Sequence, residues 1–377
     1  MLKTAIIGCG KIADAHAEQL RRIPGCEIVG VCDREPLMAR QLYDRFPVRA
    51  YFTDIGRLLE EARPDVVHVT TPPESHFSVA MQCMAAGCHV YVEKPFALDE
   101  SEARQMIAAA QAAGRKITAG HDDQFSHVAR RMRGLIAEGY LGGPPVHMES
   151  YYCYELKDSA YANALLQDKA HWVRRLPGKL LHNIISHGIA RIAEHLDSDT
   201  PEVFAHGYRS RFLVERNELD LIDELRVVIA DGYRTTAYFT FSSQMRPALH
   251  QFRIYGPGNG ILLDQDQETL VRLRGERMKS YLEKFVTPLL QAHEYCSNVR
   301  SNFRLFRQND FHMKSGMKYL IESFYRAIEA ESEPPISYRE ILLTTRIMGE
   351  IFRQVNAGAA DAAPVSQLQD TPVGQMC

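Results

Sequence analysis

The sequence has no C-x-x-C pair, no hydrophobic run long enough to cross a membrane and no marked excess of one charge. Its eight cysteines are dispersed, and several lie in hydrophobic segments, which is typical of buried thiols in a reducing compartment. No stretch approaches the ~20 apolar residues of a membrane helix. The formal net charge of -3 gives no field for binding nucleic acid through its phosphates. These absences predict a soluble, cytoplasmic protein with no nucleic-acid partner and no integral membrane segment.

The N-terminal hydrophobic segment, residues 2–7, leads directly into a glycine motif. It is too short for the apolar region of a signal sequence, so we expect no targeting peptide. The length of 377 residues, with 45% hydrophobic and 24% charged residues, favours two globular domains.

The first third of the chain alternates short hydrophobic runs with amphipathic segments. We expect strands at 2–7, 27–32, 66–70, 89–92 and 117–119, and helices at about 13–23, 36–45, 54–62, 75–86 and 100–113. Strands that alternate with helices of this length predict an open, doubly wound parallel sheet, an α/β fold.

A glycine motif, Gly8-Cys9-Gly10-Lys11-Ile12-Ala13, follows the first strand and opens the first helix. In the pattern G-x-G-x-x-A, Gly8 permits a tight turn, Gly10 lets a pyrophosphate approach the backbone, and the helix N-terminus attracts its charge. The motif predicts a dinucleotide site of the Rossmann type, with Gly8, Gly10, Lys11 and Ile12 as cofactor-binding candidates.

Asp33 stands at the end of the second strand, where a carboxylate can accept hydrogen bonds from the adenosine ribose hydroxyls. A carboxylate would repel a 2′-phosphate, which favours NAD as the cofactor. Arg34 could pair with such a phosphate, so NADP stays open. Both residues are cofactor-binding candidates.

Two further segments, residues 71–76 (Thr-Pro-Pro-Glu-Ser-His) and 93–95 (Glu-Lys-Pro), follow later strands. Together with the glycine motif and their spacing, they make residues 1–125 resemble the glucose-fructose oxidoreductase / inositol dehydrogenase (Gfo/Idh/MocA) family. The resemblance implies that the lysine of Glu-Lys-Pro reaches both the nicotinamide and the reacting hydroxyl. The candidates here are Thr71, Pro72, Pro73, His76, Glu93 and Lys94.

Lys94 lies at the carboxyl end of a parallel strand, beside the crevice in which open α/β sheets bind ligands. A positively charged nicotinamide should lower the pKa of this lysine. The ammonium can polarise a substrate oxygen or stabilise an alkoxide, which makes Lys94 a catalytic candidate.

From about residue 123 the pattern changes to consecutive strands at 146–152, 203–208, 224–229, 235–242 and 251–255. Such a succession predicts a largely antiparallel open sheet in an α+β domain. We divide the chain into a Rossmann domain (1–122), a substrate-binding and oligomerisation domain (123–357) and a flexible tail (358–377). The resemblance implies a homodimer or homotetramer formed through the second sheet.

Residues 178–190 resemble the family's helix G-G-x-L-x-D-x-G-x-H-x-x-D, with Gly178 and His187 in register. His187 then takes the place of the catalytic histidine. Asn183 replaces the family's aspartate and Ala190 its last aspartate. Positions 183 and 187 share one helical face, so we expect Asn183 to hydrogen-bond the substrate hydroxyl. An asparagine carries no negative charge, however, and so cannot raise the pKa of the histidine as an aspartate would.

Three more residues are substrate-binding candidates: His182 as a rival to His187, Tyr152 on a strand face, and Arg174 as a partner for a substrate carboxylate or phosphate. We expect no metal, because His182 and His187 are five residues apart rather than four. We also expect no metal at the cluster His121-Asp122-Asp123.

A basic amphipathic stretch at about 278–306 is longer than this family leads us to expect, with Leu282, Phe285, Val286, Leu289 and Leu290 at apolar positions. It could pack on a neighbouring subunit, cover the cleft or contact an anionic membrane.

The leading hypothesis is transfer of hydride between a nicotinamide cofactor and a secondary alcohol or ketone of a sugar, cyclitol or nucleotide-sugar. The alternatives are an NAD-assisted glycosidase and a non-catalytic NAD(P)-binding regulator.

Overall fold

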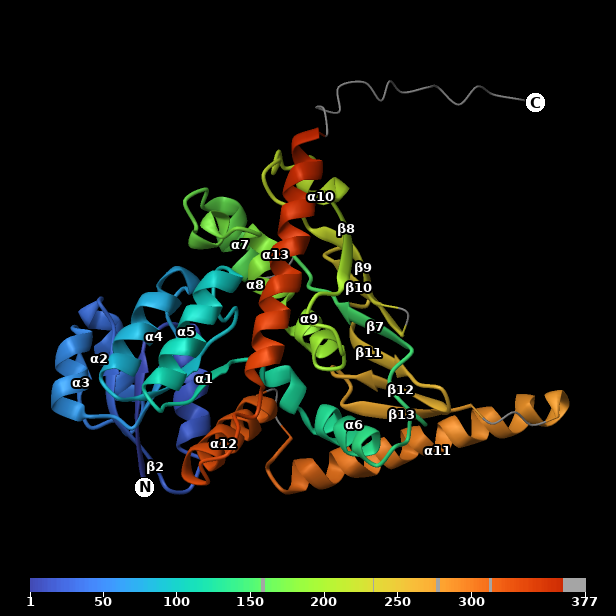
Figure 1. Cartoon of the computed structure of the whole chain (residues 1–377), viewed down its shortest axis with the longest axis horizontal. Helices are drawn as coiled ribbons and strands as arrows, with labels where there is room; N and C mark the ends of the chain where they lie inside the picture. Colours follow the sequence, from blue (N-terminus) through green and yellow to red (C-terminus); the bar gives the residue numbers. More distant parts are fainter. Residues whose placement is uncertain (157–159, 233, 276–278, 312–313, 362–377) are drawn as a thin grey trace.

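The computed structural model describes residues 1–156, 160–232, 234–275, 279–311 and 314–361. Two sheets lie side by side, each with its own hydrophobic core (Figure 1). The predicted tail from 358 falls for its greater part, residues 362–377, outside the described residues.

The first sheet is entirely parallel, in the order β3-β2-β1-β4-β5-β6. Its strands are β1 (Leu2–Ile7), β2 (Cys26–Cys32), β3 (Tyr51–Phe52), β4 (Val66–Val69), β5 (His89–Val92) and β6 (Ile117–Ala119). Its helices are α1 (Lys11–Leu20), α2 (Pro36–Arg45), α3 (Ile55–Ala62), α4 (His76–Ala85) and α5 (Glu100–Ala112). The predicted doubly wound α/β sheet is confirmed, and the two-residue β3 is an addition to it.

Local sequence explains where these helices begin. Pro36 occupies the first turn of α2, where its missing N–H costs nothing. The carboxylates of Asp54 and Asp99 accept hydrogen bonds from the backbone N–H groups of Arg57 (2.8 Å) and Glu102 (2.9 Å). These caps satisfy N–H groups that have no partner within the helix.

The second sheet is mixed and mostly antiparallel, in the order β13-β12-β11-β7-β10-β9-β8. Its strands are β7 (His147–Tyr152), β8 (Glu202–Tyr208), β9 (Glu224–Asp231), β10 (Thr235–Ser242), β11 (His250–Tyr255), β12 (Asn259–Asp264) and β13 (Thr269–Arg274). One pair, β7 and β10, is parallel. The predicted largely antiparallel sheet is therefore confirmed.

Shorter helices connect and cover this second sheet: α6 (His127–Ala137), α7 (Ala160–Gln167), α8 (Lys179–Ile184), α9 (Ser186–Ala193) and α10 (Arg211–Val214). Helix α9 packs against β7 and β10. On the outer face of the sheet, Phe204, Val228 and Tyr238 are cross-strand neighbours and stay exposed.

Three long helices complete the chain: α11 (Ser280–Arg307), α12 (Ser315–Glu329) and α13 (Tyr338–Asp361). Although it follows the second sheet in sequence, α12 packs in the core of the first, through residues such as Phe324 and Tyr325. Helix α13 runs between the two sheets (Figure 1) and contacts both α5 and β8. Among the described residues, no helix has the length and hydrophobicity that a bilayer crossing requires.

Candidate active site

The glycine loop between β1 and α1 leaves space for a phosphate. Gly8 has φ +96°, and a Cβ at this position would lie 2.7 Å from the backbone carbon of Thr70, so only glycine fits. A Cβ at Gly10 would meet nothing within 4 Å and would fill the open space in front of the loop. The N-terminus of α1 at Lys11 faces the same loop, which is the arrangement that binds a pyrophosphate.

The carboxylate of Asp33 holds the loop in place. It accepts hydrogen bonds from the N–H groups of Cys9 (2.7 Å) and Glu35 (2.9 Å). Asp33 thus stands at the end of β2, beside the glycine loop, as the ribose contact requires. Arg34 is exposed.

His76 joins the two other loops at this edge of the sheet. Its buried imidazole lies 2.8 Å from the carbonyl oxygen of Thr71 and 3.0 Å from that of Pro95. Burial lowers the pKa of His76 against the opposing effect of these carbonyl groups. The neutral imidazole has a single N–H, which can donate to one of these carbonyls at a time, so His76 connects the Thr-Pro-Pro loop with the Glu-Lys-Pro loop.

Lys94 connects the loop after β5 to helix α8. Its peptide bond to Pro95 is cis, and its Nζ donates to the backbone carbonyl of Asn183, 3.0 Å away. Helix α8 ends at Ile184, so this carbonyl belongs to the last turn, where helices leave carbonyls without partners. Burial lowers the pKa of Lys94, partly offset by the charge of Glu93.

Glu93 points away from the crevice and into the core. Its Oε1 lies 2.8 Å from Nε2 of His16. Burial alone would raise the pKa of Glu93, but the hydrogen bond and charge of His16, together with Lys94, hold it at about 2. This contact anchors Glu93 in the core and fixes the loop before Lys94.

This anchor continues through the core as a chain of hydrogen-bonding distances. Nδ1 of His16 lies 2.8 Å from Nδ1 of His68, whose Nε2 lies 2.8 Å from the hydroxyl of Tyr325. That hydroxyl lies 2.9 Å from Thr4 Oγ1. Every member is buried, so each polar group has a partner, as a low-dielectric interior requires.

His187 lies in the first turn of α9, opposite Lys94. A Cβ at the next residue, Gly188, would lie 2.4 Å from Phe239, so glycine allows the close approach of α9 to the sheet. The imidazole of His187 is buried and stacks with Tyr152 at 5.7 Å between ring centroids. Burial lowers the pKa of His187 to about 3 despite the opposing charge of Asp123.

Two carboxylates from the turn after β6 face His187. Asp122 Oδ1 lies 3.9 Å from Nε2, and Asp123 Oδ2 lies 3.7 Å from Nδ1. Burial raises the pKa of Asp122 to about 6 against the charge of Lys314, with Asp123 adding to the rise. The pKa of Asp123 is lowered because His187 and Arg191 outweigh its burial. Two adjacent carboxylates with opposite shifts are typical of acid–base sites.

No role was predicted from the sequence for this carboxylate pair or for Lys314. Asp122 and Asp123 follow β6 at the carboxyl edge of the parallel sheet, which is a signal that could have identified them. Lys314 is far away in sequence, and only the fold brings its Nζ to 3.7 Å from Asp122 Oδ2.

The cluster of Asp122, Asp123 and His187 also has a metal-like arrangement, with one potential ligand atom from each within 4.8 Å of the others. Side-chain cations already lie beside both carboxylates: Lys314 at 3.7 Å from Asp122 and Arg191 at 3.4 Å from Asp123. A divalent ion would have to compete with these charges, which favours acid–base chemistry.

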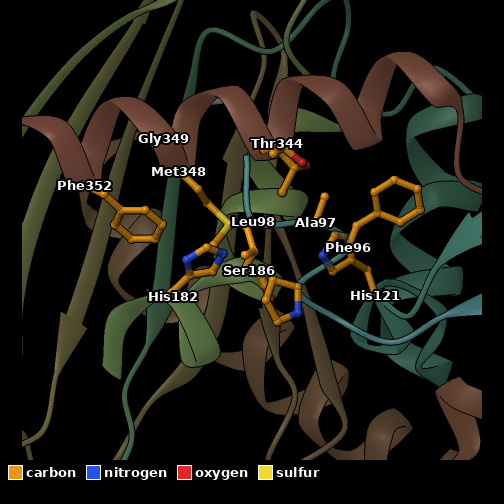
Figure 2. Close-up of a pocket in the computed structure, with 12 residues that line it drawn as sticks. Phe96, Ala97, Leu98, His121, His182, Ser186, Thr344, Met348, Gly349 and Phe352 are labelled. Atoms are coloured by element: carbon orange, nitrogen blue, oxygen red, sulfur yellow. The ribbon is translucent and has the colours of Figure 1, made fainter. Parts of the chain in front are cut away.

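His182 lies outside this cluster. Figure 2 shows it beneath α13 with Ser186, Met348 and Phe352 around a small cavity. Its ring centroid is 4.8 Å from that of Phe352. Burial lowers the pKa of His182 to about 4. These surroundings favour a packing role over that of the rival base.

Arg174 is also occupied elsewhere. Its guanidinium donates to Glu218 (2.9 Å), to Asp220 (2.9 and 3.1 Å) and to the carbonyl of Leu165 (2.8 and 3.2 Å). The side chain is buried, and these five contacts use all three nitrogens. This geometry favours a structural role over the expected contact with a substrate anion.

The glycine loop, Asp33 and Lys94 share the carboxyl edge of a parallel sheet, and the second domain brings His187 to the same place. These features define a two-domain, dinucleotide-binding protein of the Rossmann type with a site between its domains.

Comparison with known proteins supports a dinucleotide-binding domain of the Rossmann type. Residues 2–121 match the model of an oxidoreductase family with an NAD-binding Rossmann fold. The chain is 32% identical over 142 residues to the D-glucoside 3-dehydrogenase of Escherichia coli, covering 37% of this chain and 40% of that protein. It is 25% identical over 311 residues to the myo-inositol 2-dehydrogenase of Thermotoga maritima, covering 80% and 89%.

Among solved structures, the WlbA dehydrogenase of Bordetella pertussis, in complex with NADH and UDP-GlcNAcA, shares the fold with a TM-score of 0.74. The identity is 15%, and the match covers 95% of this chain and 96% of that one. The alignments with four of the curated relatives span only 36% to 48% of those proteins. Residues 2–121 of this chain thus match the NAD-binding Rossmann domain of the Gfo/Idh/MocA oxidoreductase family.

Proposed function

We propose that this protein is an NAD-dependent oxidoreductase that transfers hydride between the nicotinamide and a secondary alcohol or ketone of a sugar, cyclitol or nucleotide-sugar. The observation that carries the proposal is the meeting of Lys94, His187 and the Asp122–Asp123 pair between the two sheets. Relatives named as glucoside and inositol dehydrogenases support the choice of substrate class.

The residues that would hold NAD fit their task. The glycine loop, with open space at Gly10, would receive the pyrophosphate at the N-terminus of α1. Asp33 has a carboxylate at the position of the ribose contact, which favours NAD over NADP. When bound, the nicotinamide supplies the acceptor or donor of the hydride.

His187 is the proton acceptor of this proposal. Burial lowers the pKa of His187 from the ordinary value near 6.5 to about 3. The imidazole is therefore in its neutral form at neutral pH, which is the form that can accept a proton. Asp123, 3.7 Å from Nδ1, stabilises the imidazolium as it forms, because its charge favours the protonated ring.

Lys94 acts on the reacting oxygen. The contact of Nζ with the carbonyl of Asn183 fixes the ammonium group at the domain boundary. From there it can donate to the substrate oxygen and stabilise the negative charge that develops on it. Asn183 thus positions Lys94 through its backbone carbonyl. The negative charge that an aspartate would carry at position 183 is supplied instead by the Asp122–Asp123 pair.

The test is reduction of NAD by the purified protein with a panel of sugars, cyclitols and nucleotide-sugars. We expect Lys94→Ala to lower turnover by at least ~10²-fold and His187→Ala by ~10² to 10⁴-fold, with NAD affinity retained in a calorimetric titration. His182→Ala is the matched control and should keep most of the turnover.

Two results would replace this proposal. Tight NAD binding without turnover on any substrate would favour the regulator. Release of an aglycone from a glycoside without net NADH would favour the glycosidase. Loss of turnover in His182→Ala but not in His187→Ala would move the proton-accepting role to His182.

A further inference from the structure

Helix α11 is held against β13 and the turn before it by polar contacts. Asn298 Nδ2 donates to the carbonyl of Leu270 (2.9 Å), and Asn302 Nδ2 donates to that of Gln267 (3.0 Å). Arg272 donates to Glu294 (2.9 Å). Within the helix, the buried residues are Glu294 and Asn298. These contacts fix the rotation of α11 with its polar face against β13.

The opposite face of α11 is hydrophobic and exposed. It carries Leu282 (41% exposed), Phe285 (69%), Leu289 (70%), Val299 (67%), Phe303 (61%) and Phe306 (69%), with the exposed Ala292 and Cys296 between them. We call these eight residues the α11 stripe. The N-terminal end of α11 extends beyond the second sheet (Figure 1). An amphipathic helix normally turns such a face inward, so this one needs a partner.

The spacing of the α11 stripe alternates between three and four residues over its whole length. Positions 282, 285, 289, 292, 296, 299, 303 and 306 are the a and d positions of four heptads. A repeat of 3.5 residues produces a narrow seam that packs against another helix.

We propose that the α11 stripe pairs with the same stripe of a second copy of this chain, antiparallel and around a two-fold axis. In this alignment residue i faces residue 588 − i of the second copy. Leu282 then faces Phe306, Phe285 faces Phe303, Leu289 faces Val299 and Ala292 faces Cys296. The small residues meet at the centre and the large ones towards the ends, so the stripe is complementary to itself, as a closed two-fold interface requires.

Charge favours the antiparallel direction. The C-terminal half of α11 carries Arg300, Arg304 and Arg307. A parallel pair would bring these three arginines beside their own copies, with repulsion. The antiparallel pair places them beside the N-terminal half, where the charges of Glu283 and Lys284 cancel, so this repulsion is avoided.

The area is that of a stable dimer. Large apolar side chains bury about 150–250 Å² when fully covered, so six that are 41% to 70% exposed leave roughly 600 Å² per helix. The standard protein interface buries about 800 Å² per partner, and flanking residues such as Tyr281 and Tyr295 would supply the remainder. A patch of this size is at the upper end of what monomers expose, and such patches often have a function.

The decisive measurement is the mass of the full-length protein at micromolar concentration by sedimentation velocity. Phe285→Glu combined with Phe303→Glu should halve the mass, because each glutamate would face the other across the seam. Gln291→Glu, at an exposed polar position of the same helix, should leave the mass unchanged. Both substituted phenylalanines are exposed, so unchanged melting temperature and NAD affinity will show that the variant is folded.

Three results would overturn the proposal. The first is a wild-type monomer, and the second is an unchanged mass in the double variant while Val228→Glu, on the outer face of the second sheet, dissociates the assembly. The third is binding of α11 to vesicles of anionic phospholipid, lost in the double variant, with no change in mass. That result would assign the stripe to a membrane surface.

A cross-linking experiment tests the direction of pairing. In a background with Cys377→Ser, Ala292→Cys places a thiol opposite Cys296 of the second copy, and mild oxidation should give a covalent dimer. Without that substitution, the two Cys296 residues are separated by four residues, about 6 Å along the helix axis, which is too far for a disulfide. Cross-linking through Cys296 alone would instead indicate a parallel pair and contradict the antiparallel interface.

Discussion

Replacing Asp122 with asparagine should stabilise the NAD-free protein at neutral pH. The pKa of Asp122 is raised from 3.8 to about 6, so the folded protein binds this proton more tightly than the unfolded chain does. Stability therefore falls as the pH rises between these two values. The full difference corresponds to ~3 kcal/mol. Because Asp123 titrates together with Asp122, and Lys314 pairs with the same carboxylate, we expect a gain of ~1–2 kcal/mol at pH 7.

Asp123→Asn is the matched control, with the opposite sign. The pKa of Asp123 is lowered in the folded protein, so its contribution to stability is present at neutral pH and is lost as the pH falls through the folded pKa. Asp123→Asn should therefore destabilise the protein at pH 7.

The assay is urea unfolding of the wild type and both variants from pH 5 to pH 8. The free energy of unfolding of Asp122→Asn should exceed that of the wild type increasingly as the pH rises. Curves that run parallel for wild type and Asp122→Asn, or equal destabilisation by both variants at pH 7, would refute the assignment of the raised pKa to Asp122. NAD reduction should be impaired in both variants, so Asp122→Asn should be more stable and less active than the wild type.

Three further predictions follow from the geometry. Asp33→Ala should weaken NAD binding by about 1 to 3 kcal/mol and narrow the preference for NAD over NADP. Equal NAD affinities of wild type and variant in a titration would show that Asp33 does not contact the ribose. Gly8→Ala should abolish NAD binding and lower the melting temperature, because its Cβ would overlap Thr70 at 2.7 Å and its φ of +96° is strained for alanine; a variant that binds NAD normally would contradict the tight turn. Arg174→Met should lower the free energy of unfolding by up to about 3 kcal/mol, because it removes an ion-pair partner of the buried Glu218. The KM for the substrate should stay unchanged. A raised KM with normal stability would instead indicate that Arg174 binds the substrate.

The Rossmann half of the fold could be predicted from the sequence because its signals are local. Hydrophobic runs, glycines and capping residues lie within a few positions of the elements they specify, and β5 and α2 have the predicted bounds. The strand β3 was missed because it has two residues. The parallel pairing of β7 with β10 joins segments that are far apart, which no local pattern encodes.

The site was predictable only where one segment carries a motif. Lys94 and His187 were predicted from their motifs, and the fold brings both to the candidate site. The helix expected to contain both positions 183 and 187 is in fact two helices, α8 and α9, with Ile185 between them. Asn183 therefore reaches Lys94 through a carbonyl that the helix end leaves available. Lys314 and Arg191 were not identified, because their roles depend on charges that meet only after folding.

The hydrogen-bonded chain from Glu93 to Thr4 has a consequence for the order in which the protein matures. Tyr325, which completes it, belongs to α12 and is synthesised after the whole second sheet. Until α12 emerges from the ribosome, His68 and Thr4 lack their shared partner, and the hydrophobic surface that Phe324 covers stays open. The nascent Rossmann domain is therefore an incomplete folding unit, and the loop that carries Lys94 receives its final support only near the end of translation.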